Sequence, residues 1–263
     1  MPKVQVESFA EASPIEREGV IATIVWRIFL IWTVIGAAVM VAGLNGGNVA
    51  AWTSSTAAQE ALISILAYAD LIWMVSAAAV VYLRVAALDG LTRARLSAAV
   101  ILAGSTAVEW IGAQTGAPFG PYRYTDSFGP RILGVLPIAI PLAWLVILLG
   151  ARLLVLEIQP TVTRIALSFW VAGIALLTDL NLEFIAWKVR GYWQWYPGEA
   201  NPPGWPPWQN FFSWFVLALV LHALTPWRDD RPVVAHRVAR AALVVPIMNV
   251  LFLLVHVSRW IRA

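Results

Sequence analysis

Three acidic side chains stand in stretches of sequence that are otherwise long and apolar. Glu109 lies near the end of one such stretch, and Asp179 and Glu183 lie four residues apart in another. If both stretches are helices, this spacing places Asp179 and Glu183 on one face. A charge at the centre of a bilayer costs about 3 kcal/mol or more, so ionisable residues at this depth indicate a functional site. Glu183 lies nearer the boundary, where water could solvate it.

Neighbouring carboxyls of this kind suggest acid chemistry on an apolar substrate. Carboxyls in a poorly solvated pocket do not all ionise, because desolvation and like-charge repulsion penalise each further charge. A neutral carboxylic acid beside an alkene is a suitable proton donor. Aromatic π faces stabilise the resulting cation by about 2 kcal/mol or more when water is excluded. Such faces are abundant after the pair Asp179 and Glu183: Trp187, Trp193, Trp195, Trp205, Trp208 and Trp214.

A structural interpretation competes with the chemical one. Each carboxyl could be hydrogen-bonded to a loop, or paired with Arg123, Arg131, Lys188 or Arg190, and serve only to hold helices together. Most single tryptophans could be packing residues or interfacial anchors. Asp70 and Asn249 also fall at membrane depth, where a helix-to-helix hydrogen bond is as good an explanation as a function.

The elements that must position these residues are membrane-spanning helices. Hydrophobic residues make up 60% of the 263 residues, charged residues only 13%, and the mean hydropathy is +0.74. We therefore expect an all-α fold, a polytopic transmembrane bundle of about seven helices. Residues 1–263 are expected to form a single membrane domain, of which residues 1–19 are a polar N-terminal tail without a cleaved signal peptide. The expected spans are 20–43, 60–83, 94–113, 131–156, 162–188, 208–225 and 237–259. In the fourth, Pro137 and Pro141 must kink the helix or end a shorter first part.

Two connections rich in Gly, Pro and aromatic residues run from Gly112 to Pro130 and from Gly191 to Trp208. Irregular backbone near a membrane persists only when it packs on protein or lines a cavity, so we expect both loops to cover one end of the bundle as a lid. Lys and Arg predominate in the loops on the membrane side opposite the lid. This bias predicts that the N-terminus is cytoplasmic and that the lid faces outward. The side opposite the lid holds Lys3, Arg17, Arg84, Arg93, Arg95, Arg152, Arg164, Arg228, Arg231, Arg237 and Arg240, against Arg123, Arg131, Lys188, Arg190, Arg259 and Arg262 on the lid side.

Several classes of protein are disfavoured by what the sequence lacks. It has no cysteine, which excludes disulfides, thiolate metal sites and thiol nucleophiles. Its three histidines are scattered, unlike those of a di-iron hydroxylase, and it has no phosphate-binding glycine loop. A retinal-binding protein needs a buried lysine in its last helix, and the only lysines are Lys3 and Lys188. The net charge of +3 comes from basic residues at helix ends, which indicates topology rather than nucleic-acid binding.

Two stretches resemble the signatures of a known family. They are the run EWIGAQTGAPFGPYRY from Glu109 to Tyr124, and DLNLE at 179–183 followed by GYWQW at 191–195 and GWPPWQNFFSW at 204–214. Both are similar to those of the membrane carotenoid 1′,2′-hydratases, which are related to the archaeal bisanhydrobacterioruberin hydratases. The second differs at Phe184, where the family commonly has Pro, and at Ser213, where it has Gly. The resemblance covers about half the chain.

The resemblance implies addition of water to the terminal 1′,2′ double bond of an acyclic (ψ) carotenoid end, as in lycopene, γ-carotene or a bacterioruberin precursor. It implies a prokaryotic membrane enzyme whose partners are a carotenoid, water and the bilayer, without a metal or other cofactor. Asp179 is expected to be the acid, with Glu109 and Glu183 positioning water or restoring the proton. The side chains expected to bind substrate are Trp110, Phe119, Tyr122, Tyr124, Trp187, Trp193, Trp195, Asn210 and Trp214.

Three alternatives remain open at this point. A carotenoid end-group cyclase starts with the same protonation but lets an internal alkene capture the cation. A membrane prenyltransferase could use Asp179 and Glu183 to hold Mg²⁺ with a diphosphate. A transporter or receptor would use the carboxyls to relay protons or bind cations.

Overall fold

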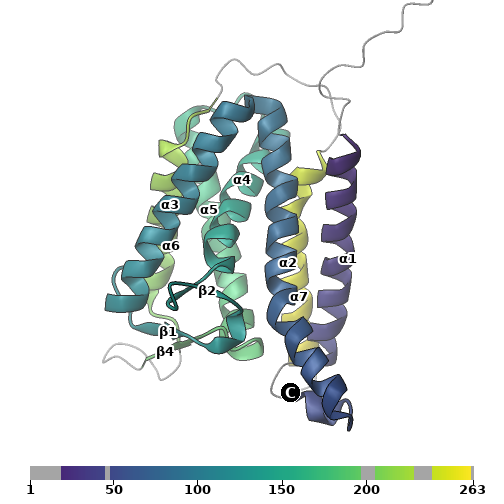
Figure 1. Ribbon diagram of the computed structural model, residues 1–263. Helices are drawn as coiled ribbons and strands as arrows, with labels where there is room; N and C mark the ends of the chain where they lie inside the picture. Colours follow the sequence, from purple (N-terminus) through teal and green to yellow (C-terminus); the bar gives the residue numbers. More distant parts are fainter. Residues whose placement is uncertain (1–18, 45–47, 197–204, 228–238, 262–263) are drawn as a thin grey trace, which may run out of the picture.

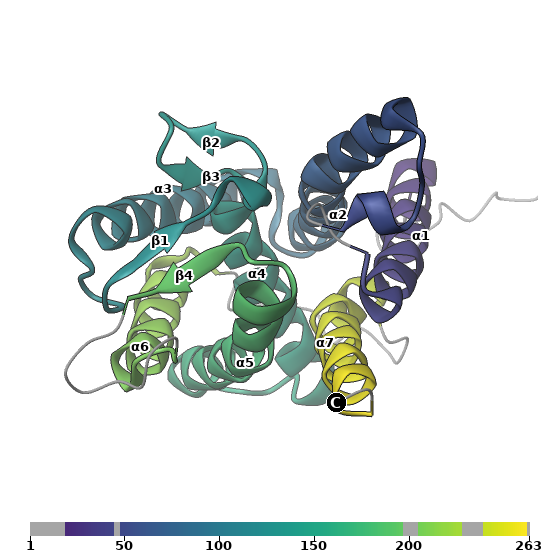
Figure 2. The same cartoon turned by 90° about the horizontal axis from the view of Figure 1, so that it is seen from below.

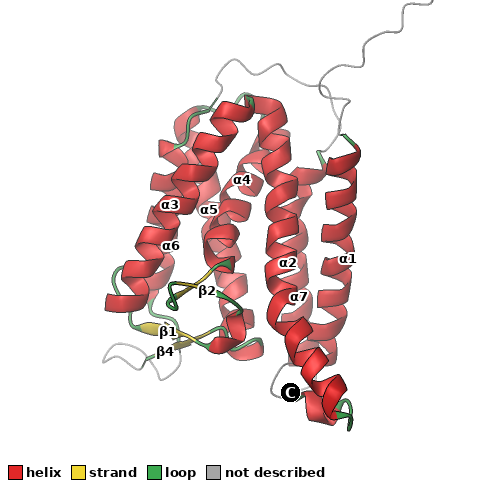
Figure 3. Ribbon diagram, viewed as in Figure 1, coloured by secondary structure: helices red, strands yellow, loops and turns green. Residues whose placement is uncertain are grey.

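A computed structural model describes residues 19–44, 48–196, 205–227 and 239–261. Within these ranges seven α-helices form an upright bundle, and only short strands accompany them (Figures 1 and 3). The helices are α1 Val20–Ala42, α2 Thr56–Asp89, α3 Leu91–Thr115, α4 Ala139–Ile158, α5 Arg164–Phe184, α6 Trp208–Leu224 and α7 Val244–Trp260. Six helical segments of the described residues are long and apolar enough to cross a membrane. They are α1 to α4, α5 extended by the short helix that follows it, and α7 extended by the short helix that precedes it. Helix α6 is apolar but shorter, with 17 residues. The expected all-α membrane bundle is confirmed.

Helix α4 forms the centre of the bundle. It contacts α2, α3, α5 and α7, and its side chains Trp144, Ile147 and Leu148 are fully buried. Seen from below, α3 and α6 lie to one side of α4, α1, α2 and α7 lie to the other, and α5 lies beside α4 between α6 and α7 (Figure 2). The outer helices instead expose large apolar side chains such as Val34 and Ile31 on α1, as expected of surfaces that face lipid.

The start of the fourth predicted span was wrong. Residues 131–138 form a small antiparallel hairpin, in which β2 Arg131–Ile132 pairs with β3 Leu136–Pro137, and α4 begins only at Ala139. The turn between the strands has positive φ at Leu133 and Gly134, which a right-handed helix cannot contain. Pro141 is compatible with α4 because it lies in the first turn, where its missing N–H is not needed.

The two unusual loops meet at one end of the bundle, as expected of a lid. Strand β1 Tyr122–Tyr124, from the first loop, pairs antiparallel with β4 Trp193–Trp195, from the second, at the lower end of the molecule in Figure 1. The Ser213 hydroxyl on α6 donates to the Pro118 carbonyl at 2.8 Å, which fastens the first loop to the bundle. Residues 197–204 of the second loop lie outside the described residues.

Two close approaches bring the lid onto its supporting helices. A Cβ at Gly112 on α3 would lie 2.7 Å from the ring of Phe119, so only glycine lets that ring cover the helix end. Gly120 has φ +106° and its Cβ would lie 2.4 Å from Pro207, so both backbone conformation and space require glycine there.

Polar contacts also join the helices away from the lid. Asn249 on α7 donates to the Thr178 hydroxyl at 3.0 Å and accepts from Asn181 at 2.8 Å, which is the helix-to-helix bonding considered for it. At the opposite end, Arg152 of α4 is fully buried and forms a 2.6 Å ion pair with Asp89 of α2. Arg152 is therefore a core residue rather than a loop charge, but the basic bias keeps its direction without it.

Membrane orientation can be tested because the natural chain contains no cysteine. Ser127 in the lid and Thr92 at the start of α3 are both exposed. Strand β1 of the lid and the start of α3 lie at opposite ends of the bundle (Figure 1). We expect Ser127→Cys to react with a membrane-impermeant thiol reagent on intact cells, and Thr92→Cys to react only after permeabilisation. The unmodified chain supplies the background, and the reverse pattern would show that the lid faces the cytoplasm.

Candidate active site

Glu109 is held by three neutral hydrogen-bond donors. It lies in the last two turns of α3 with only 4% of its surface exposed. The hydroxyls of Tyr122 and Tyr124 donate to Oε2 at 3.0 and 2.8 Å, and the indole of Trp144 donates to Oε1 at 2.9 Å. Both tyrosines reach the carboxyl because side chains two residues apart on a strand point to the same face. Three of the roughly four acceptor positions of the carboxylate are thus filled.

The two tyrosines are fixed as donors by their surroundings. Burial, reinforced by the negative charge of Glu109, raises the pKa of both Tyr122 and Tyr124. Their phenolic protons therefore stay in place over the physiological pH range, and each can donate to Glu109.

Glu183 is held in the same way by the second strand of the lid. The indole N–H groups of Trp193 and Trp195 both donate to its Oε1, the first at 2.8 Å. These tryptophans are again two residues apart, on the strand that pairs with β1. Glu183 is only 4% exposed, so the idea that water solvates it near the boundary was wrong. The lid excludes that water and supplies the donors instead.

Asp179 has a different environment. It lies one turn before Glu183 on α5 and is fully buried. Asn210 of α6 donates to its Oδ2 at 3.0 Å, whereas Oδ1 is buried without a hydrogen-bond partner among the described residues. A carboxylate oxygen left in this state is unfavourable, but a protonated carboxyl tolerates it. Asp179 is the best suited of the three to carry a proton.

The basic residues considered as counterions have other partners. Arg123 donates to Gln194, Arg131 pairs with Asp126 at 2.9 Å, and the Lys188 ammonium lies 3.6 Å from the ring centre of Trp187. Arg190 pairs with Asp70 of α2, and this ion pair explains why Asp70 is found at membrane depth. Among the described residues, the three carboxyls are bonded by Tyr, Trp and Asn, and ion pairing does not explain them.

These side chains line a pocket beneath the lid, whose empty space, including the part open to the surroundings, is about 290 Å³. Its lining consists of Glu109, Phe119, Tyr122, Tyr124, Ile140, Glu183, Trp193, Trp195, Asn210 and Trp214. Most residues expected to bind substrate are thus brought together. Asp179 lies behind this wall, joined to it through Asn210.

Some expected residues lie elsewhere. The pocket lining includes neither Trp110 nor Trp187, and Trp205 and Trp208 are 63% and 83% exposed. The tryptophan group therefore divides into pocket walls and surface residues. Conversely, the sequence interpretation missed Trp144, which bonds Glu109 and stacks on Trp214 with ring centres 4.1 Å apart. In the predicted span 131–156 Trp144 stands near the middle of an apolar helix, and no local pattern there indicates that its indole meets Glu109 of α3.

Comparison with known proteins places this site in a family. The sequence profile of the family described as "Carotenoid biosynthesis protein" matches residues 69–262, about three quarters of the chain. The chain belongs to this family. The matched range contains the three carboxyls, both lid strands and Trp144, so the match to the carotenoid biosynthesis family covers every residue that lines the pocket.

A curated relative has a more specific description. The chain is 30% identical over 142 residues to the bisanhydrobacterioruberin hydratase of Haloarcula japonica. The alignment covers 53% of this chain and 47% of the relative, so it spans about half the length of that protein. No solved structure matches the chain.

The hydrogen bonds to Glu183 predict a large loss of stability for one substitution and a small loss for another. Glu183→Leu leaves two buried indole donors without an acceptor, which we expect to lower the free energy of unfolding by roughly 2–6 kcal/mol. Glu183→Gln keeps a carbonyl acceptor and should lower the free energy of unfolding by only about 1 kcal/mol. Unfolding in detergent, followed by near-ultraviolet circular dichroism of the tryptophans, measures both. Equal stability of the two variants would contradict the bonding described for Glu183.

Proposed function

We propose that this protein is a carotenoid hydratase that adds water to the terminal 1′,2′ double bond of an acyclic (ψ) end group and forms a tertiary alcohol. The observation that carries the proposal is a group of three buried carboxyls bonded by neutral donors under an aromatic lid. Membership of the carotenoid biosynthesis family supports a polyene substrate, and the name of the Haloarcula relative supports hydration.

Asp179 is proposed as the proton donor. Its Oδ1 has no described hydrogen-bond partner, so its carboxyl is the one most easily kept neutral in this apolar setting. The end group that fills the pocket lies against the wall formed by Asn210, behind which Asp179 holds the proton. For the transfer, the Asn210 side chain has to move aside so that the Asp179 carboxyl meets the double bond. The proton then passes to C2′, which breaks the 1′,2′ π bond and leaves a tertiary cation at C1′.

Glu109 and Glu183 are proposed to direct the water. Both line the pocket and are fixed as acceptors by five donors in total, three on Glu109 and two on Glu183. The oxygen of a water molecule bonds to C1′, its surplus proton passes to one of these carboxylates, and the proton then returns to Asp179. One water is consumed and no electrons are transferred, so the reaction needs no redox cofactor.

The aromatic walls are proposed to stabilise the cation. Trp214 lines the pocket and stacks on Trp144, while Phe119 closes the lid side. Their π faces attract a developing positive charge without acting as nucleophiles. Because the indole N–H groups of Trp193 and Trp195 are engaged by Glu183, these two rings present carbon faces rather than polar edges to the pocket.

The substrate is proposed to be a membrane-dissolved carotenoid such as lycopene, γ-carotene or a bacterioruberin precursor. The protein would act in a prokaryotic cell membrane, with its N-terminus in the cytoplasm and the lid outside. An end-group cyclase is the second candidate, since it shares the protonation step. Two charge-bearing acceptors at the pocket wall favour capture by water over a dry cyclisation. The same donors around Glu183 also favour this reading over a Mg²⁺–diphosphate site.

The proposal predicts that two conservative substitutions abolish the reaction. In a host that makes lycopene or γ-carotene, the natural chain should give pigments heavier by one water, with oxygen taken from heavy-oxygen water. Asp179→Asn removes the proton donor and Glu109→Gln removes a carboxylate, so each should lower alcohol formation by about a thousandfold. Mass spectrometry of the extracted pigments measures the yield.

The control is Asp126→Asn, which makes the same chemical change on an exposed carboxyl of the lid and should leave the yield unchanged. Pigments of unchanged mass but altered absorption spectrum would support the cyclase. Near-normal alcohol from both Asp179→Asn and Glu109→Gln would refute the catalytic assignment.

A further inference from the structure

An apolar cavity adjoins the candidate active site on its inner side. It lies between α2, α4, α5 and α7, and its empty space, including the part open to the surroundings, is about 680 Å³. Ile140, Trp193 and Trp214 line both this inner cavity and the carboxyl pocket. The two hollows are therefore neighbours that share side chains as walls.

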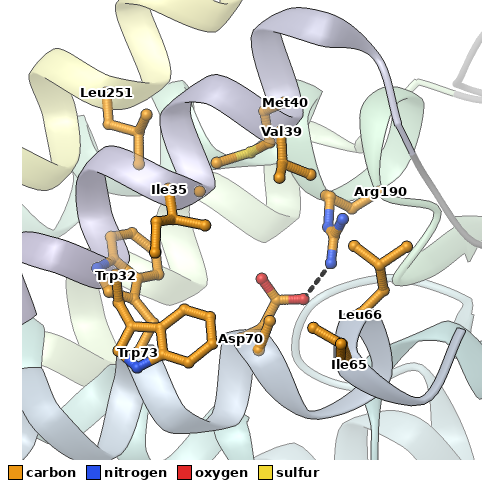
Figure 4. Close-up of a pocket in the computed structure, with 12 residues that line it drawn as sticks. Trp32, Ile35, Val39, Met40, Ile65, Leu66, Asp70, Trp73, Arg190 and Leu251 are labelled. Carbon is orange, nitrogen blue, oxygen red and sulfur yellow. Dashed lines mark hydrogen bonds and ion pairs between the residues drawn. The ribbon is translucent and has the colours of Figure 1, made fainter. Parts of the chain in front are cut away.

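A second cavity continues from the first toward the surface. This outer cavity lies between α1, α2 and α7, and its empty space, including the part open to the surroundings, is about 520 Å³. Met40, Asp70, Trp73 and Arg190 line both the inner and the outer cavity. Figure 4 shows Asp70 and Arg190 directed toward each other at this junction, with apolar side chains around them.

The outer cavity is bordered by side chains on the lipid-facing surface. Ile35 of α1 and Ile65 of α2 line it, and they are 46% and 55% exposed. Both helices are apolar enough to span a membrane, so this border faces acyl chains rather than water. The cavities thus form a series from the membrane to the three carboxyls.

We propose that the two cavities hold the polyene chain of the substrate, which enters from the bilayer between α1 and α2. The chain passes the Asp70–Arg190 ion pair and crosses the inner cavity, so that its terminal double bond lies in the carboxyl pocket. This inference rests on the proposed function for the identity of the occupant.

The lining favours a long hydrocarbon over a polar ligand. The charged groups at the junction are engaged with the protein, because Arg190 bonds both Asp70 and the Tyr192 hydroxyl. The indole N–H of Trp73 donates to Thr33 at 2.8 Å, which leaves its ring to the cavity. The remaining lining residues on α1 are apolar, as a polyene requires.

The ion pair has a positioning role in this arrangement. It ties α2, which forms one wall of both cavities, to the segment that follows Glu183 on α5. Its charges cancel locally, so a hydrocarbon can pass without meeting an unpaired charge.

Two valines on α1 provide a matched test. Val39 lines the outer cavity, whereas Val34 is 68% exposed on the lipid-facing surface. Val39→Trp places an indole in the proposed path and should weaken binding of lycopene to the purified protein about tenfold, the equivalent of roughly 1.4 kcal/mol. Val34→Trp makes the same change outside the path and should bind within about twofold of the unmodified chain. Binding is measured as pigment retained per protein, and hydration as alcohol formed.

A second cavity variant controls for a loss of folding that is specific to substitution at Val39. A Cβ at Gly36 would have its nearest neighbour, the Met40 methyl group, 4.0 Å away, so Gly36→Phe fits locally and should also block the cavity. Loss of binding in both cavity variants, with Val34→Trp intact, supports the path. Equal binding by Val39→Trp and the unmodified chain, or equal losses in Val39→Trp and Val34→Trp, overturns it and leaves lipid as the occupant.

These measurements separate the path from the reaction. If Val39→Trp selectively loses pigment but the unmodified chain forms no alcohol, the polyene path stands and the proposed hydration fails. If the unmodified chain forms alcohol and Val39→Trp forms it equally well, hydration stands and the path is wrong.

Discussion

The structure depends on one constraint, which is that carboxyls in a membrane need hydrogen-bond donors where water is scarce. Glu109 and Glu183 stand on different helices, α3 and α5, and neither helix has a spare donor to give them because its own N–H groups are used in the backbone. The lid resolves this by placing a two-stranded sheet across the helix ends. One strand serves Glu109 with two hydroxyls and the other serves Glu183 with two indoles. Strand alternation makes both sets point inward.

The same contacts join folding to chemistry. The aromatic side chains that satisfy the carboxyls are also the walls of the pocket, so the lid cannot close correctly unless the acids are in place. A two-stranded sheet has little stability of its own, and here it is fixed by the carboxyls beneath it and by α6 at Pro118. The buried acids are therefore structural anchors of the lid as well as the groups proposed to react. The structural interpretation considered from the sequence and the chemical one are thus compatible.

The sequence was sufficient for the parts that follow a period or a composition. The four-residue spacing of Asp179 and Glu183, the apolar spans and the Gly- and Pro-rich loops follow local rules, and these predictions hold in the fold. The pairing of β1 with β4 joins residues about 70 positions apart, and no period signals a three-residue strand. The bond from Trp144 to Glu109 also depends on how α3 meets α4. The burial of Glu183 could not be foreseen without the lid. The start of α4 was misplaced because the turn at Leu133 and Gly134 is short and its first residue, Leu133, is apolar.

A departure from regular helix geometry explains why Glu183 lacks a counterion although Arg190 follows it closely. Residues seven apart in an α-helix lie almost two full turns apart and share a face, so a continuous α5 would place Arg190 on the same side as Glu183. Instead, residues Ile185–Val189 form a π-helix, closed by the Arg190 N–H to the Ile185 carbonyl at 2.8 Å. The wider turn changes the direction of the following side chains. Arg190 then reaches Asp70 on α2, and Glu183 is left to the indoles of the lid. One local widening thus keeps a cation away from the pocket and places an ion pair at the junction of the two apolar cavities.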